Sequence, residues 1–131
     1  MDLFVTSDVL AAMRDHARVS LPNEACGVLF GSAGAIDRAA RAENVHPDPA
    51  RHFEIDPQLL IDAHRKARQG GPAVAGYYHS HPSGVAEPSA TDRALAAGDG
   101  MVWAIMAAGA ITFWRDDPGG FIALSYTVGP A

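Results

Sequence analysis

The sequence predicts an α/β protein in which a mixed, curved β-sheet is flanked by helices. Two stretches, at residues 7–17 and 57–68, place apolar residues at helical spacing. Short apolar or β-branched runs bounded by glycine and proline lie before, between and after them, which is the pattern of strands. Because strand and helix patterns alternate along the chain, we expect the helices to pack against one sheet.

The chain begins with a predicted strand at residues 3–5 and a helix that Ser7 would cap and that runs to about residue 17. His16 lies near the end of this helix, where the helix dipole favours a cation, and we assign it to structure rather than to a site. The apolar stripe of the helix consists of Leu10, Met13 and Ala17. This helix is therefore expected to cover the core.

A hairpin and a loop follow. Residues 26–31 and 35–41 predict two strands joined at Gly34, and residues 43–51 contain two prolines, which indicates a loop. His46 in this loop, and His52 after it, are candidates for substrate contacts, although ordinary surface positions explain them more simply.

The second half of the chain alternates in the same way. Residues 53–55 predict a short strand, and Asp56 followed by proline predicts the start of a helix to about residue 68. The continuous apolar run at 101–106 indicates a strand covered on both faces, paired with residues 110–115. A turn at 117–120 leads to a last strand whose one face carries Ile122, Leu124, Tyr126 and Val128.

Two histidines end the strand predicted at residues 73–78. His79 and His81 are two positions apart, and successive side chains of a strand point to opposite faces, so both imidazoles lie on the same side. Ser89 and Asp92 then mark the start of a short helix, whose first turn could face back toward the histidines. Two neutral imidazoles and one carboxylate are three ligands for a metal of the zinc type, with a fourth position open for catalysis.

Each of these residues also has a simpler interpretation. A His-x-His pair alone is more often a surface feature, and Ser89 with Asp92 could form only a capping box. Glu24, at the mouth of an apolar strand, would by itself be a solvated edge residue, and the neighbouring Cys26 is a buried packing residue rather than a nucleophile. It is the joint pattern that favours a metal site.

This pattern resembles the JAMM family of metallopeptidases, also called MPN+ or Mov34-type. The family motif is a distant Glu, then His-x-His, then Ser and Asp, and it matches Glu24, His79, His81, Ser89 and Asp92. The flanking residues 22–31 and 53–57 are similar as well, so the resemblance spans most of the chain. It implies the cytidine-deaminase-like α/β arrangement of that family.

The resemblance also implies a mechanism. Zn²⁺ held by His79, His81 and Asp92 would activate a water, and Glu24 would take the proton of that water and pass it to the leaving amine. Ser89 would donate a hydrogen bond to the oxyanion, a role that competes with helix capping for one hydroxyl.

The implied reaction is hydrolysis of a peptide or isopeptide bond after the C-terminal Gly-Gly tail of a ubiquitin-like or sulfur-carrier protein, the partner of the minimal family members. Three alternatives stay open: a metal-free scaffold, a peptidase for small or cell-wall peptides, and a non-peptidase metal enzyme on the same fold, such as a deaminase or an iron oxygenase. The scaffold would be expected to have lost ligands, and a deaminase would need a cysteine pair.

Length, charge and cysteine content limit the other possible classes of protein. With 131 residues, 13.8 kDa and 48% hydrophobic residues, the chain predicts one domain over residues 1–131. A net charge of −5 without a Lys/Arg cluster argues against nucleic acid, and no run is long enough to span a membrane. One cysteine allows no internal disulfide, which agrees with a cytoplasmic protein. Monomer and homodimer both stay open.

Overall fold

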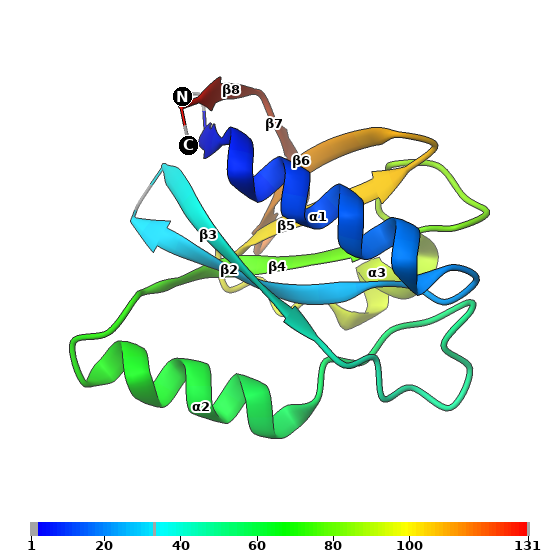
Figure 1. Ribbon diagram of the computed structural model, residues 1–131, viewed down its shortest axis with the longest axis horizontal. Coiled ribbons are helices and arrows are strands. Elements are labelled where there is room, and N and C mark those ends of the chain that lie inside the picture. Colours follow the sequence, from blue (N-terminus) through cyan, green and yellow to red (C-terminus); the bar gives the residue numbers. More distant parts are fainter. Residues whose placement is uncertain (1–2, 33, 131) are drawn as a thin grey trace.

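One curved, mixed sheet organises the chain, with α1 on one side of it and α2 on the other (Figure 1). The computed structural model describes residues 3–32 and 34–130. The strand order is β7-β6-β5-β4-β2-β3-β1-β8. The elements are β1 (Leu3–Thr6), α1 (Ser7–Ser20), β2 (Cys26–Ser32), β3 (Ala35–Ala42), α2 (Pro57–Arg68), β4 (Val74–Ser80), α3 (Ala90–Leu95), β5 (Val102–Ala107), β6 (Ala110–Asp117), β7 (Gly120–Leu124) and β8 (Tyr126–Gly129).

The sheet is mixed, as the sequence predicts. Strand β4 runs parallel to β5, and β1 runs parallel to both β3 and β8. The other neighbouring strands are antiparallel. The parallel pair β4·β5 matters most for function, because it sets the carboxyl end of β4 beside that of β5 at one end of the sheet.

Helix α1 begins one residue earlier than the capping prediction and extends to Ser20. The N-cap is Thr6, not Ser7: Thr6 has an extended backbone, and its hydroxyl accepts the N–H of Val9. Ser7 already has helical geometry and so cannot fill that role. The predicted stripe does face the core, with Leu10 and Met13 fully buried.

His16 is structural but is not the helix-end cation that the sequence suggests. Its side chain is buried, and its Nδ1 lies 2.7 Å from the hydroxyl of Tyr78. Burial, assisted by the positive charge of Arg41, lowers the pKa of His16, so the neutral form is favoured. The position therefore contributes a buried hydrogen bond to the contact between α1 and β4.

The strands β2 and β4 form the centre of the sheet and lie very close together where Gly27 faces Tyr78. A Cβ added at Gly27 would lie 2.1 Å from a ring carbon of Tyr78, so only glycine leaves room for the ring. Alternation along β4 then places Tyr78 on the α1 side and His79 on the opposite side.

The segment predicted as a strand at residues 53–55 is not one. It makes a single bridge, between Ile55 and Asn44. The reason is that the Asn44 side chain binds the backbone here: it accepts the N–H of Glu54 and donates to the carbonyl of His52. Backbone groups bonded to a side chain are not available to a neighbouring strand.

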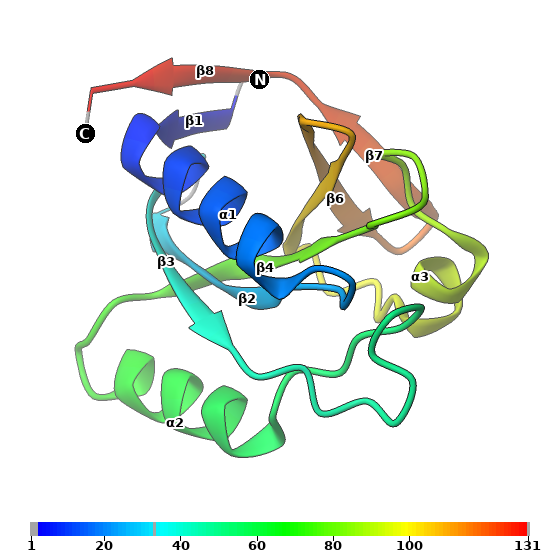
Figure 2. The ribbon, with the colours of Figure 1, turned by 45° about the vertical axis from the view of Figure 1, so that its right-hand side comes forward.

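The last predicted strand is also divided. Strand β7 pairs with β6, whereas β8, one residue further along, pairs with β1 at the other edge of the sheet. Figure 2 shows this C-terminal segment, in red, crossing from one edge to the other above α1. Ile122 and Val128 are 50% and 51% exposed, so the four alternating residues do not share one buried face.

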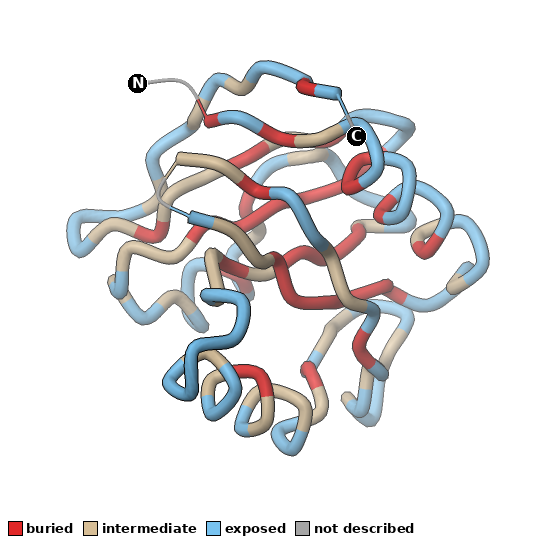
Figure 3. Tube along the Cα trace, turned by 60° about the vertical axis from the view of Figure 1, so that its left-hand side comes forward, coloured by how far each residue is buried: buried red, intermediate tan, exposed pale blue. Residues whose placement is uncertain are grey.

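Burial follows the central strands, as the red segments of Figure 3 show. Every residue of β5 is buried, in agreement with the strand predicted to be covered on both faces. Among the described residues, no helix combines the length and the apolar character that crossing a membrane requires.

Candidate metal centre

The end of β4 places two imidazoles together. The backbone N–H of His81 bonds to the carbonyl of Met106 at 2.7 Å, which continues the pairing with β5 beyond the last residue of β4. As a result His79 and His81 project toward one another, and their Nε2 atoms lie 3.0 Å apart. His79 is buried, and His81 is partly accessible.

Asp92 reaches the same point from α3. Its Oδ2 lies 3.1 Å from Nε2 of His79 and 3.2 Å from Nε2 of His81. The same oxygen accepts the backbone N–H of Ser89 at 3.0 Å, and the Ser89 hydroxyl accepts the N–H of Asp92 in return. The capping box is therefore present, and it aims the carboxylate at the histidines instead of excluding that role.

The three donor atoms fit a tetrahedral metal. Ligands at zinc–nitrogen and zinc–oxygen distances of about 2.0–2.1 Å are separated by about 3.3 Å. The observed separations are 3.0, 3.1 and 3.2 Å. Glu24, His79 and His81 likewise bring their ligand atoms within 4.8 Å of one another, so a fourth oxygen donor lies close by. These residues could hold a divalent cation.

A hydrogen bond fixes the orientation of His81. Its Nδ1 donates to the carbonyl of Val85 at 2.8 Å, which leaves the lone pair of Nε2 directed at the site. The following carbonyl, of Ala86, accepts from the hydroxyl of Thr112, and that hydroxyl accepts from the indole N–H of Trp114. Strand β6 thus holds the loop after β4 in place.

Aromatic rings fix His79. The ring of Phe53 stacks on it with centroids 4.2 Å apart and planes inclined by 18°. The ring of Trp103 meets it edge-on at 5.8 Å. Because both neighbours are rigid, His79 is pre-positioned. The sequence places Phe53 in a strand and Trp103 in the core, and neither pattern indicates contact with a histidine.

Glu24 stands just before β2, at the same end of the sheet. Its N–H bonds to the carbonyl of Pro49, and the next N–H, of Ala25, bonds to the hydroxyl of Ser80 at 2.8 Å. Ser80, the residue between the two histidines, therefore ties the start of β2 to the end of β4. Glu24 itself is 6% exposed.

Asn44 organises the loop that covers this region. Its amide nitrogen donates to the carbonyls of Glu24, Pro49 and His52, and its oxygen accepts the N–H of His46 and of Glu54. The sequence pattern predicts only a loop at this residue. Its one available signal was the tendency of asparagine to bond its own neighbouring backbone.

Burial and neighbouring charges perturb the ionisation of the site. Burial raises the pKa of Glu24 to about 7, with a smaller opposing effect of His81 and a further increase from the charge of Asp92. Burial alone would also raise the pKa of Asp92, but hydrogen bonds from His79 and His81 outweigh it and hold that pKa well below its usual range. A carboxyl group with a pKa near neutrality can both accept and return a proton.

The pKa values of the two histidines shift in opposite directions. Burial lowers the pKa of His79, which favours the neutral imidazole that a metal ligand requires. Burial also acts against charge on His81, yet its bonds to Asp92 and to the Val85 carbonyl outweigh this and raise its pKa. The raised pKa of His81 reflects the negative charge of Asp92, which a cation between them would neutralise.

Cys26 does not belong to this chemistry. It is fully buried, and burial together with the charge of Glu24 raises the pKa of its thiol to about 12. The prediction of a packing residue is confirmed, since such a thiol forms almost no thiolate at neutral pH.

The site opens into a hollow of about 350 Å³, the metal-site hollow. Its walls are formed by the candidate site residues Glu24, His81, Ser89 and Asp92 together with residues 50–53, 82–85, 87, 88 and 91. His52 lies in this wall, and its ring packs against that of His46 with centroids 4.8 Å apart. Of the two loop histidines, the structure therefore places only His52 where a substrate could touch it.

Known proteins with sequences similar to this chain include a desampylase, a probable conjugate cleaving protease and a peptidase. A desampylase from Haloferax volcanii is 35% identical over 99 residues, which cover 74% of this chain and 71% of that protein. A probable TtuB-protein conjugate cleaving protease from Thermus thermophilus is 33% identical over 69% of this chain and 60% of its own length. A CysO-cysteine peptidase from Mycobacterium tuberculosis is 35% identical over 72% of this chain and 65% of its own length.

Solved structures show the same fold. Protein DSY2949 from Desulfitobacterium hafniense superposes with a TM-score of 0.85 at 28% identity, over 98% of this chain and 94% of that one. A JAMM protein described as a metalloprotease-like zinc site in the proteasome and signalosome gives a TM-score of 0.60 at 18% identity, over 97% and 99% of the two chains. Residues 6–117 also match the family model described as prokaryotic homologs of the JAB domain.

Proposed function

Because this chain belongs to the family of prokaryotic homologs of the JAB domain, we propose that it is a zinc-dependent peptidase that cleaves after the C-terminal Gly-Gly tail of a ubiquitin-like or sulfur-carrier protein. The observation that carries the proposal is the convergence of three donor atoms, on His79, His81 and Asp92, within 3.2 Å of one another. Relatives named for cleaving a TtuB conjugate and a CysO-cysteine bond support the substrate class. The bond cleaved is a peptide or an isopeptide bond.

In this proposal His79, His81 and Asp92 are the metal ligands. Two imidazole nitrogens and one carboxylate oxygen suit Zn²⁺ and leave its fourth position open, the arrangement of catalytic zinc sites. When bound there, zinc would polarise a carbonyl and would lower the pKa of a water to about 7. The contacts of Phe53 with His79 and of Val85 with His81 keep the imidazoles aligned for this task.

Glu24 moves the proton. Its carboxyl group lies beside the histidines, and its pKa of about 7 is suited to taking a proton from the attacking water at neutral pH. The same group then returns the proton to the leaving amine. A bound cation would lower this pKa, so the base form of Glu24 would dominate in the metal-loaded protein.

Ser89 stabilises the oxyanion. Its hydroxyl oxygen accepts the N–H of Asp92, and a hydroxyl group has one hydrogen to donate besides its two acceptor positions. Capping and donation to the oxyanion use different parts of the same group, which supports assigning both roles to Ser89. A preorganised donor of this kind contributes about 3 kcal/mol to the lowering of the barrier.

The test combines metal analysis with a cleavage assay. Protein purified without added metal should hold about one zinc per chain, and His81→Ala should hold much less. It should release an intact Gly-Gly terminus from a sulfur-carrier protein that bears a C-terminal cysteine or a lysine-linked adduct, as followed by mass spectrometry. A chelator should stop the reaction, and zinc should restore it.

Glu24→Gln is the matched control for this experiment. It should keep its zinc while losing hydrolysis by about a hundredfold or more. Cleavage that survives the chelator, or full zinc content in His81→Ala, would contradict the proposal. We further propose that the protein acts in the cytoplasm, since its single cysteine is a buried thiol that needs no oxidising compartment.

A further inference from the structure

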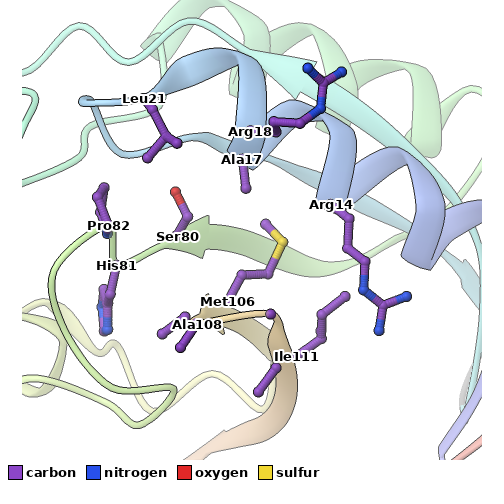
Figure 4. A pocket seen from close by; sticks show the side chains of 13 residues that line it. Arg14, Ala17, Arg18, Leu21, Ser80, His81, Pro82, Met106, Ala108 and Ile111 are labelled. Carbon is purple, nitrogen blue, oxygen red and sulfur yellow. The ribbon is translucent and has the colours of Figure 1, made fainter.

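A second hollow lies beside the metal centre, on the α1 side of the sheet. This α1 groove has a volume of about 360 Å³ and runs between the end of α1 and the turn joining β5 to β6 (Figure 4). Its lining is mainly apolar, with Leu21, Met106 and Ile111 as the large side chains. Leu21 is 58% exposed, so the groove presents apolar surface that nothing in the described part of the chain covers.

The α1 groove adjoins the metal-site hollow at the end of β4. His81 and Pro82, at the end of β4, line both of them. Ser80 and Met106 belong to the α1 side, whereas His79 points to the other side. A polypeptide that places a bond at the metal centre can therefore extend past His81 directly into the α1 groove.

The volume of the groove indicates which part of a substrate would occupy it. Glycine has no side chain, so a Gly-Gly tail cannot fill an apolar space of about 360 Å³. A segment with apolar side chains can, and it would bury surface such as Leu21. In the proposed reaction, the leaving group, which is the polypeptide released when the bond after Gly-Gly is cut, can supply such a segment.

The far end of the groove carries an unneutralised cation. Figure 4 shows Arg14 at the opposite end from His81. In the part of the chain that the structure describes, no hydrogen bond or ion pair of Arg14 is found, although Arg18, one turn later, is paired with Asp15. Asp15 also binds Arg41, so it has no further charge to offer Arg14. In a chain with a net charge of −5, this end of the groove is a local site for a carboxylate.

We propose that the α1 groove binds the leaving segment of the substrate, with an apolar side chain against Leu21 and Met106 and an acidic side chain on Arg14. The inference rests on the proposed function and adds the substrate class: targets whose released segment is apolar near the cleaved bond and acidic several residues beyond it. The α1 groove then selects the target by its released segment, in addition to the recognition of the ubiquitin-like tail.

The test uses one ubiquitin-like donor with three leaving groups after Gly-Gly. These are a single cysteine, an eight-residue extension with Leu near the bond and Glu at the far end, and the same extension with Lys in place of Glu. Wild-type protein should show a KM about fivefold lower for the Glu extension than for the Lys extension, as expected for an exposed ion pair. Arg14→Glu should reverse this preference and leave the single-cysteine substrate unchanged.

Matched controls separate the groove from general surface effects. Arg68→Glu makes the same charge change on the exposed end of α2 and should leave the preference intact. Leu21→Ser should raise KM for both extensions, whereas Val19→Ser, at a residue 52% exposed and outside the groove, should not. An equal effect of Arg14→Glu on all three substrates, or no effect on any, would overturn the proposal.

A binding measurement keeps this result distinct from the proposed reaction. The free extension peptides are titrated into Glu24→Gln protein while the methyl NMR signals of Met106 and Leu21 are followed. Saturable shifts with the Glu peptide, weakened by Arg14→Glu, support the groove even if the chain cleaves none of the donor substrates. Shifts confined to residues of the metal-site hollow would count against it.

Discussion

The two sides of the sheet differ in what they bury. On the α1 side a connected cluster of thirteen buried apolar residues extends from β1 to β6, whereas the corresponding cluster on the α2 side contains three, among the residues described. The α2 side instead buries the polar groups Glu24, His79 and Asp92. Buried polar groups are costly unless they are paired, so the site depends on a fold that the other side stabilises. Stability and chemistry should therefore respond to different mutations.

The largest effect is expected from removing a proposed metal ligand on the α2 side. Asp92→Ala should abolish zinc binding and hydrolysis, because two imidazoles alone do not complete the site. It should lower the free energy of unfolding of the metal-free protein by about 1–3 kcal/mol, because His79 and the N–H of Ser89 lose a buried hydrogen-bond partner. Zinc analysis, a cleavage assay and denaturant unfolding in chelator measure the three quantities.

Asp92→Asn separates the two roles of this residue. Its side-chain oxygen can still accept the N–H of Ser89, but it carries no charge for the metal. We expect the helix cap to survive and the zinc to be lost. Retention of both zinc and activity in Asp92→Ala would reduce Asp92 to a capping residue.

On the α1 side we expect a large effect on stability and little effect on activity. Met13 is 0% exposed, and Met13→Ala should lower the free energy of unfolding by about 2–5 kcal/mol through the cavity left in the core. The activity per folded molecule, measured well below the melting temperature, should remain that of the wild type. A comparable loss of activity would show that the two sides are not independent.

The pH dependence of stability should reveal the raised pKa of Glu24. Its pKa is about 7 in the folded protein and 4.5 ordinarily, so between these values the metal-free folded state holds a proton that the unfolded chain has lost. Stability must then fall as pH rises from 4.5 to 7. Metal-free Glu24→Gln lacks this titrating group. Its free energy of unfolding, relative to that of the wild type, should therefore rise by up to about 3 kcal/mol over that pH range. Parallel unfolding free energies at all pH values would contradict the raised pKa.

The smallest effect is expected at β6, which contributes to the stability of the sheet and also holds the loop beside the candidate metal centre. Thr112→Val keeps the shape of the side chain but removes the bond to Ala86 and the acceptor for Trp114. Stability should fall by about 1 kcal/mol, and activity should fall about tenfold, as for other residues that hold metal ligands in place. Unchanged activity at reduced stability would limit Thr112 to a structural role.

Much of the fold can be predicted from local pattern. The helix at 57–68, the hairpin β2–β3 and the fully buried strand β5 all follow from spacing, caps and bounding glycine or proline. The candidate ligands His79, His81 and Asp92 follow in the same way, because strand alternation and a capping box are properties of neighbouring residues. The assigned fold is confirmed by the solved structures.

Contacts between distant segments could not be predicted in this way. Nothing near Asn44 indicates that its side chain replaces a strand, and nothing near Tyr126 indicates that the chain leaves one sheet edge for the other. The bond from Thr112 to the Ala86 carbonyl, which follows the Val85 carbonyl that His81 contacts, likewise depends on β6 lying beside the loop.

The sequence by itself determined most of the elements and the residue types of the candidate site, since both depend on residue type and short-range spacing. Only the tertiary structure decided that the three donor atoms lie within 3.2 Å of one another, that Glu24 is buried enough for a pKa of about 7, and that an apolar groove adjoins the site. The physical reason is that convergence, desolvation and cavities arise where segments far apart in the chain exclude water together.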